Sequence, residues 1–421
     1  MLDRKYIVEN ADRVKKNCAD RGVAAEVDRV VELEAARKTA QTQLDDLNRR
    51  ANEVAKTIGK AKDPAERDAR KAEGRAIRDE ASAAEAQLNE INRDLDRLVR
   101  QIPNLTHPEA PLGMEPREVA RGKTPVPQFD FAPLDHVALG EKLDLFDLES
   151  AARVTGHGFY FLKNEAVLLE LALQRYAMEV LLGEGFTLTT TPDLARNEVL
   201  EGIGFIPRGP ETQIYSIEDS DLSLVATAEI TLGGLLSGQI LDEEKLPVKV
   251  CGVSHCFRTE AGAHGRATKG LFRVHQFTKV EMFAFTLPEQ SDAVLESIRG
   301  IECRIFDGLG IPYRVIDTPS GDLGGPAYRK YDLEAWMPGR GEFGEITSTS
   351  NCTDYQARRL NIRYRPKGEK GTRFVHTLNG TAVAISRALV AILENYQQAD
   401  GSVVVPEALR PWMGGVERLG A

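Results

Sequence analysis

The chain has 421 residues, of which 42% are apolar and 28% charged, enough to bury the cores of two or three domains. It contains no run of about 18 apolar residues, and its start, MLDRKYIVEN, lacks the apolar core of a secretory signal, so we expect no membrane partner and a cytoplasmic location. Five scattered cysteines without a CxxC pair argue against structural zinc and disulfides, and the net charge of −10 alone argues against a nucleic-acid partner.

Charge and aromatic residues are distributed unevenly along the chain. Residues 27–102 contain 16 basic and 16 acidic side chains and no aromatic residue, whereas residues 103–421 contain 32 basic and 43 acidic side chains. We therefore expect an N-terminal domain over 1–102, a linker over 103–133 that contains seven prolines, and a larger domain over 134–421.

The N-terminal domain carries two heptad patterns. Mostly apolar residues recur at alternating spacings of three and four from Val30 to Ile58 and again from Ile77 to Ile102, separated by a segment that contains glycine and proline. A 3.5-residue period predicts two helices that pair through one seam, so we expect an antiparallel coiled-coil hairpin over 27–102. Two helices folded onto a globular core are the alternative interpretation.

The turn of this hairpin is basic. Residues 49–78 carry ten basic against five acidic side chains. The basic residues are Arg49, Arg50, Lys56, Lys60, Lys62, Arg67, Arg70, Lys71, Arg75 and Arg78. This excess indicates either an arm that contacts the phosphates of a nucleic acid or an ordinary solvated helix face.

The larger domain alternates short strand-like segments with amphipathic helices. Strands are predicted at 186–191, 248–253, 280–285 and 313–316, and helices at 165–182, 291–309 and 382–396. We therefore predict an α+β domain built on an antiparallel sheet, in which a Gly-rich loop over 259–271 can approach a phosphate chain closely.

Several charged residues lie inside or directly beside apolar segments of this domain. They are Arg258, Glu260, Arg273, Glu281, Glu345 and Arg387. A buried charge is costly unless it is paired, so such a set indicates either internal ion pairs or a site for a charged ligand.

The sequence around these charges resembles the class II aminoacyl-tRNA synthetases. The stretch 257–260 with Arg273 is similar to their motif 2, and 378–381 running into Ser386-Arg387 is similar to their motif 3. Within that class the chain resembles the seryl-tRNA synthetase family, through VATAEITL, FRTEAG…GLFRVHQFTKVEMF, SNCTDYQARRLNIRYR and FVHTLNGTAVAISR. The N-terminal hairpin resembles the tRNA-binding arm of that family.

This resemblance implies an ATP-dependent ligase that activates L-serine to seryl-adenylate and transfers it to the 3′ end of tRNA(Ser), with tRNA(Sec) as a further candidate. It implies ATP and Mg²⁺ without zinc, and a homodimer, because Pro192 after the strand FTLTTT resembles the motif 1 proline at the dimer interface. The alternatives are a paralogue that ligates a small amino acid to another carrier and a non-catalytic scaffold that kept the fold.

The resemblance also implies a set of site residues. By this resemblance, the residues expected to bind serine are Thr227, Ala228, Glu229, Arg258, Glu281 and Thr381. The residues expected to bind ATP are Arg258, Thr259, Glu260, Arg273, Val274, Phe277, Glu345, Ile346, Thr347, Ser348 and Arg387. Mg²⁺ is expected to bind through Glu345 and Ser348. Catalysis is expected from charge neutralisation, with Arg258, Arg387 and Glu345 as the catalytic residues.

Individual roles follow from the same resemblance. Arg258 is expected to bind the α-phosphate and the carboxylate of serine, Glu229 its ammonium group, and Glu281 its hydroxyl group. The chain departs from the pattern at Thr347 and Thr349, where bacterial members more often carry Ser and Cys, and this departure concerns the fine fit of the substrate.

Overall fold

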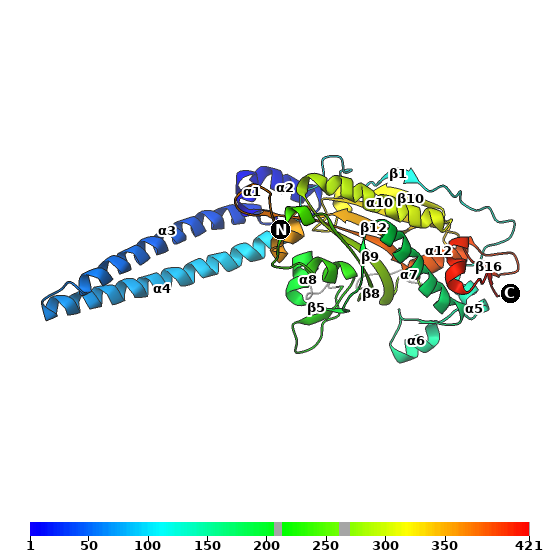
Figure 1. Ribbon diagram of the computed structural model, residues 1–421, viewed down its shortest axis with the longest axis horizontal. Coiled ribbons are helices and arrows are strands. Elements are labelled where there is room, and N and C mark those ends of the chain that lie inside the picture. Colours follow the sequence, from blue (N-terminus) through cyan, green and yellow to red (C-terminus); the bar gives the residue numbers. More distant parts are fainter. Residues whose placement is uncertain (206–212, 261–269, 421) are drawn as a thin grey trace. The chain divides into compact units, whose positions relative to one another are not determined.

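The computed structural model describes residues 1–205, 213–260 and 270–420, so most of the predicted Gly-rich loop lies outside the described residues. The chain divides into two compact units, Met1–Leu105 and Thr106–Ala421 (Figure 1). In the described ranges no helix combines the length and the apolar character that a membrane crossing requires.

Two long helices dominate the first unit (Figure 1). The unit contains α1 (Arg4–Glu9), α2 (Ala11–Asp20), α3 (Val27–Ile58) and α4 (Pro64–Gln101). The carboxylate of Asp63 accepts a hydrogen bond from the N–H of Ala65, and Pro64 occupies the first turn, so the chain stops after α3 and restarts as α4. The predicted helical hairpin is confirmed.

The seam between α3 and α4 is apolar but thin. At its base Val30 and Leu33 pack with Leu95 and Leu98, where α1 and α2 add further apolar side chains. Towards the turn the buried residues of the seam are Leu47, Ile77, Ala81 and Ala84. Small side chains let two helices approach closely, and the remaining faces of the hairpin stay polar.

The second unit is built on a sheet of eight strands among the described residues. Its strands, in spatial order, are β1 (Arg117–Arg121), β10 (Tyr313–Asp317), β11 (Arg329–Met337), β12 (Glu342–Asn351), β15 (His376–Ala384), β9 (Gln276–Thr286), β8 (Val248–Phe257) and β4 (Thr187–Thr190). Neighbouring strands are antiparallel except β4 and β8, which are parallel. The predicted α+β class is confirmed.

Helices and short strands complete the second unit. The helices are α5 (His136–Lys142), α6 (Leu148–Val154), α7 (Glu165–Gly183), α8 (Asn197–Ile203), α9 (Ala228–Gly234), α10 (Ser291–Gly308), α11 (Tyr355–Leu360) and α12 (Ile385–Asn395), with 3₁₀ turns η1 (Glu243–Lys245), η3 (Pro288–Gln290), η4 (Ser320–Asp322) and η5 (Glu407–Met413). The short strands are β2 (Phe146–Asp147), β3 (Phe161–Leu162), β5 (Leu194–Arg196), β6 (Leu222–Leu224), β7 (Ile240–Asp242), β13 (Arg363–Arg365), β14 (Arg373–Phe374), β16 (Val403–Val404) and β17 (Arg418–Leu419).

Part of the proline-rich segment belongs to the sheet. From Thr106 onwards the chain lies in the second unit, and β1 pairs with β10 as an edge strand. Arg117 of β1 forms an ion pair of 2.6 Å with the fully buried carboxylate of Asp317. Residues 106–133 therefore run with the second unit, whereas the functional domain boundaries stay a prediction.

Alternate side chains of β9 belong to two different hydrophobic cores, one on each face of the strand. Met282 and Ala284 belong to the larger core, which α7, α10 and α12 cover, whereas Phe283 and Phe285 belong to a second core with α8, α9 and α11. Because alternate side chains of a strand point to opposite faces, the odd-numbered polar residues of β9 share the face of Phe283. This register decides which charged residues can meet.

Candidate active site

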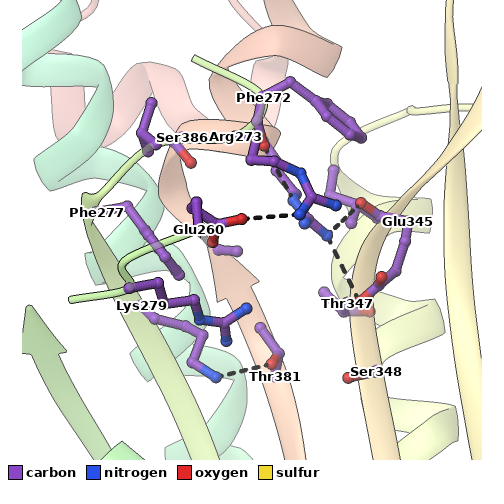
Figure 2. Close-up of a pocket in the computed structure, with 15 residues that line it drawn as sticks. Glu260, Phe272, Arg273, Phe277, Lys279, Glu345, Thr347, Ser348, Thr381 and Ser386 are labelled. Atoms are coloured by element: carbon purple, nitrogen blue, oxygen red, sulfur yellow. Dashed lines mark hydrogen bonds and ion pairs between the residues drawn. The ribbon is translucent and has the colours of Figure 1, made fainter. Parts of the chain in front are cut away.

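Residues from β9, β12, β15 and the start of α12 line one polar pocket. Its lining residues are Arg258, Glu260, Phe272, Arg273, Val274, Phe277, Lys279, Glu345, Ile346, Thr347, Ser348, Thr381, Ala384, Ser386 and Arg387. Figure 2 shows Phe277 and Lys279 on the β9 side, Glu345 and Ser348 on the β12 side, and Thr381 between them. The structure thus brings together every residue expected to bind ATP except Thr259.

Two of the three arginines in this pocket have carboxylate partners. Arg273 donates from Nη1 to Oε2 of Glu260 at 2.8 Å (Figure 2). Arg387 donates from Nη1 to the backbone carbonyl of Glu345 at 2.8 Å and lies 3.5 Å from its Oε1. Glu260 adopts φ +49°, in the left-handed region that non-glycine residues rarely enter, and its ion pair holds it there.

Arg258 differs from the other two arginines. Its Nε donates to the carbonyl of Ala226 at 3.3 Å, and its guanidinium carbon lies 5.4 Å from the ring centre of Phe277. Within the residues that the structure describes, no carboxylate forms an ion pair with Arg258. Because a guanidinium group keeps its charge at all ordinary pH values, Arg258 is available to bind an anionic ligand.

The charges of the pocket act on one another. Burial lowers the pKa of Arg387, Glu345 opposes that effect, and the neighbouring Arg258 and Arg273 add to it. Partial desolvation opposes the ionisation of Glu345, but Arg387, Lys330 and Arg258 outweigh it and hold the pKa of that carboxyl below its usual range. The pocket lining therefore carries four basic side chains against two carboxylates, Glu260 and Glu345, and this positive excess suits an anionic ligand with a bound cation.

An irregularity in β12 turns two oxygen-bearing side chains towards the pocket. Glu345 pairs with Glu334 and Thr347 pairs with Leu333, so Ile346 is an extra residue on this strand. As a result Glu345 and Ser348 are accessible, whereas Ile346 and Thr347 are buried. A carboxylate and a hydroxyl on one side of a strand are ligands that suit Mg²⁺, although no group of three or more His, Cys, Asp or Glu side chains could hold a metal by itself in the described chain.

The two threonines at which the sequence departs from the family pattern form internal hydrogen bonds. Thr347 donates from Oγ1 to Oε2 of Glu302 at 3.2 Å, and Thr349 donates to the carbonyl of Asn379 at 2.8 Å. The side chain of Glu302 is buried, and burial raises its pKa well above the usual value, an effect that the Thr347 hydrogen bond opposes. The hydroxyl groups of both threonines are thus occupied within the protein.

A buried polar triangle lies beside the pocket. The Nζ of Lys279 is 2.5 Å from Oε2 of Glu281 and 3.4 Å from Oγ1 of Thr381, and that hydroxyl donates to Glu281 at 3.0 Å. Glu281 and Thr381 are direct partners between β9 and β15. This arrangement places the carboxylate of Glu281 directly behind Lys279 and Thr381, which line the pocket.

A second carboxylate, which is half-buried, lies on the first turn of α9. Glu229 accepts from Nε2 of Gln356 and from Nδ2 of Asn379, both at 2.8 Å to the same oxygen, Oε1. Burial, with a smaller contribution from Glu281, raises the pKa of Glu229 to about 7. A carboxylate of this kind can receive a cationic group of a ligand when it is ionised.

The remaining residues expected to bind serine have local roles in the structure. Thr227 caps α9, since its hydroxyl accepts from the N–H of Glu229 at 3.2 Å, and Ala228 is fully buried. Arg258 and Thr381 line the open pocket, whereas Thr227, Ala228, Glu229 and Glu281 are not among its lining residues. Glu281 is linked to the pocket through Lys279 and Thr381, which line it, whereas the two amides that bond the Glu229 side chain are not lining residues.

The sequence analysis missed four polar residues of this region. They are Lys279, Gln356, Asn379 and Glu302. Lys279 satisfies the criterion that selected Glu281, a charge inside an apolar strand, and Asn379 lies within the motif 3 stretch. No pattern in the sequence distinguishes Gln356 or Glu302 from ordinary helix residues.

The ten basic residues around the turn of the hairpin are exposed, apart from a half-buried Arg70. Three of them form ion pairs along their own helices: Arg49 with Asp46, Arg70 with Glu73 and Lys71 with Asp68. Such exposed pairs leave the positive excess at the turn accessible to a ligand.

Pro192 is exposed directly after β4, at the end of the sheet near α7. Leu171 of α7 is 55% exposed and lines a hollow with Thr191 and Asp193, the two neighbours of Pro192 in the chain, while Leu168 of α7 and Leu194 are 43% and 39% exposed. Exposed apolar side chains that lie together are typical of an interaction surface.

Comparisons with known proteins agree over the whole chain. Residues 1–106 match the seryl-tRNA synthetase N-terminal domain, and residues 214–396 match the tRNA synthetase class II core domain (G, H, P, S and T). The chain is 63% identical over 419 residues to a serine–tRNA ligase of Rhodopirellula baltica and 56% identical over 416 residues to one of Rubrobacter xylanophilus, each covering 98% of both chains.

Solved structures give the same result. The chain is similar to a seryl-tRNA synthetase from Pyrococcus horikoshii in complex with ATP, with a TM-score of 0.91 and 40% identity over 100% of this chain and 99% of that one. It is also similar to a cytoplasmic serine–tRNA ligase from Naegleria fowleri in complex with AMP, with a TM-score of 0.88 and 32% identity over 100% and 98% of the two chains.

Proposed function

This chain belongs to the seryl-tRNA synthetase family, and we infer that it is an ATP-dependent serine–tRNA ligase. It activates L-serine to seryl-adenylate and transfers the seryl group to the 3′ end of tRNA(Ser). The observation that carries this conclusion is a pocket lined by Arg258, which forms no ion pair among the described residues, beside which lie the half-buried carboxylate of Glu229 and the buried one of Glu281, in a chain that matches the family over its full length. The alternative of a paralogue for another carrier has no support.

In this proposal one arginine and two carboxylates bind serine. Arg258 binds the carboxylate of the substrate through its planar guanidinium group. Glu229, when ionised, receives the ammonium group, and Glu281 accepts the hydroxyl hydrogen beside Thr381. A site with a committed acceptor rejects alanine, because the buried carboxylate would lose its hydrogen-bond donor.

The first chemical step is an in-line displacement at phosphorus. The carboxylate oxygen of serine attacks the α-phosphorus of ATP, the bond from that phosphorus to the bridging oxygen breaks, and pyrophosphate leaves with the electron pair. Arg258 neutralises charge at the α-phosphate and Arg387 at the leaving group, while Phe277 stacks on the adenine and Glu260 anchors it. Catalysis therefore comes from positioning and charge neutralisation.

The second step needs no protein nucleophile. A ribose hydroxyl of the terminal nucleotide attacks the carbonyl carbon of the adenylate, and AMP leaves. Glu345 and Ser348 would hold Mg²⁺, which when bound would supply further neutralisation of the phosphates.

The helical hairpin is the tRNA-binding arm in this proposal. Its positive excess at the turn supports contacts with phosphates of the RNA backbone, which fix the position of the tRNA without reading its bases. We include tRNA(Sec) as a second substrate, because phosphate contacts do not distinguish one tRNA of similar shape from another.

The proposal includes a homodimer and a cytoplasmic location. The exposed apolar face around Pro192 and Leu171 supports a homodimer formed through α7 and β4. The cytoplasm supplies ATP, serine and tRNA, and it keeps thiols reduced, which suits five cysteines that are all unpaired.

One experiment tests the reaction. The full-length protein is assayed for pyrophosphate exchange and for aminoacylation of total tRNA, with serine, threonine and alanine in parallel. We expect exchange that depends on serine and does not need tRNA, and aminoacylation with serine at least about 100-fold faster than with alanine. ATP binding without serine-dependent exchange would contradict the proposed function.

A further inference from the structure

We propose that Gln356 is a positioning residue that orients Glu229 and keeps it ready to receive the ammonium group of serine. This inference rests on the proposed function and adds to it a residue on α11, outside the pocket lining. Gln356 is fully buried and touches no part of the open pocket, so it acts through Glu229.

The hydrogen bonds of Gln356 define which way its amide group points. Nε2 donates to Oε1 of Glu229 at 2.8 Å and to the carbonyl of Ile203 at 3.1 Å, and Oε1 accepts from the hydroxyl of Thr377 at 2.7 Å. The carbonyl of Ile203 can only accept, so the reverse orientation would place two acceptors against each other. Both N–H groups are therefore used, one of them on Glu229.

The two amides that contact Glu229 fix one of its oxygens. Gln356 and Asn379 both donate to Oε1, each at 2.8 Å. In the described part of the chain, Oε2 of Glu229 accepts no hydrogen bond. The carboxylate is thus anchored through one oxygen, while the other stays available to accept hydrogens from an ammonium group.

Gln356 also acts on the charge of Glu229. Burial and the neighbouring Glu281 of β9 raise the pKa of Glu229 to about 7, whereas the N–H of Gln356 opposes this shift, together with the charges of Lys279 on β9 and Arg258 after β8. An N–H donor stabilises an ionised carboxylate but not a protonated one. Near neutral pH a single donor therefore changes the fraction of Glu229 that can bind serine.

The consequence concerns the pH dependence of serine binding. Only ionised Glu229 pairs with the ammonium group, so kcat/KM for serine should rise with pH through about 7. A hydrogen bond to a charged group changes an equilibrium by about tenfold or more, which corresponds to about one pH unit. Removal of the Gln356 donor should move the midpoint upward by about that amount.

The test compares Gln356→Leu with Gln397→Leu in the full-length protein. Gln397 is a matched control because it is also buried and also bonds backbone carbonyls, those of Leu134 and Glu394, away from the pocket. Serine-dependent pyrophosphate exchange is measured from pH 6 to 9, with KM for serine and for ATP determined separately. Thr377→Val, which removes the hydroxyl that orients the amide, is the second variant.

For Gln356→Leu we expect kcat/KM for serine about tenfold below the wild-type value at pH 6.5 and within about threefold at pH 9, with KM for ATP unchanged. Thr377→Val should show a smaller shift in the same direction, and Gln397→Leu none. Thr377→Val decides the question if Gln356→Leu does not fold.

An equal loss at every pH, or an unshifted profile in the folded variants, would overturn the inference. Absence of serine-dependent exchange in the wild-type protein would instead overturn the proposed function.

Discussion

The ammonium group of Lys279 lies 2.5 Å from the carboxylate of Glu281, and the two side chains are only 7% and 2% exposed. They are two residues apart on β9, so both project from the same face of the strand. In the described chain this is the one ion pair that Glu281 makes. The ion pair with Lys279 therefore offsets the cost of burying the carboxylate that we propose as the acceptor for the hydroxyl group of serine.

The first prediction concerns this pair. Lys279→Met keeps the length of the side chain but leaves Glu281 buried without a counter-charge, which costs several kcal/mol. We expect KM for serine in pyrophosphate exchange to rise about 100-fold while KM for ATP changes less than about threefold. Lys279→Arg should recover part of the loss.

A second lysine variant distinguishes an effect on serine binding from an effect on ATP binding. Lys330→Met removes a half-buried lysine, which pairs with Asp332 at 2.9 Å and lies near Glu345. We expect Lys330→Met to raise KM for ATP and to leave KM for serine unchanged. If Lys279→Met instead raises KM for ATP as much as KM for serine, Lys279 is a phosphate contact and our assignment is wrong.

The second prediction concerns Glu302, whose pKa burial raises well above its usual value. Because the folded protein holds a proton that the unfolded chain releases above about pH 4.3, this carboxyl lowers the free energy of unfolding as pH rises, by up to about 1.4 kcal/mol per pH unit. Glu302→Gln removes this dependence. We therefore expect the variant to gain stability relative to wild type between pH 6 and 8.

Urea denaturation at several pH values measures this difference. Glu289→Gln, at an exposed position, provides the control and should follow the wild-type curve. Parallel curves for wild type and Glu302→Gln would show that Glu302 is ionised in the folded protein.

The third prediction concerns the hairpin arm. Reversing Lys60, Lys62, Arg67 and Arg75 to Glu should raise KM for tRNA at least about tenfold and flatten its salt dependence, because each phosphate contact releases counterions. Pyrophosphate exchange should not change, since that reaction does not use tRNA. Reversing four exposed basic residues of the second unit, Lys123, Lys245, Lys367 and Arg373, controls for net charge. Normal aminoacylation by the arm variant would exclude these contacts.

The fourth prediction concerns the exposed face of α7. Leu171→Asp places a charge in the middle of the proposed dimer interface and should weaken self-association about 100-fold or more. Sedimentation over a range of concentrations measures the dimer. Val154→Asp changes a residue of α6 that is 72% exposed and should have no effect. A wild-type chain that sediments as a monomer would refute the proposed interface.

Local pattern was enough to predict much of this protein. The heptad spacing predicted the hairpin because a coiled coil needs one apolar seam and little else. The stretches around Arg258 and Arg387 predicted one shared pocket through their resemblance to motifs 2 and 3 of the class II synthetases. Charge counted by segment, rather than over the whole chain, separated a basic arm turn from an acidic second unit.

Tertiary structure decided which side chains act together. The extra residue at Ile346 brings Glu345 and Ser348 to one side, which a regular period of two would not predict. Gln356 meets Glu229 across 127 positions of sequence, and Thr347 meets Glu302 across 45. Such pairs depend on strand register and burial, which are set by packing between distant segments. The sequence alone therefore determined the fold class and the reaction, while only the folded chain determined how each carboxylate is held and charged.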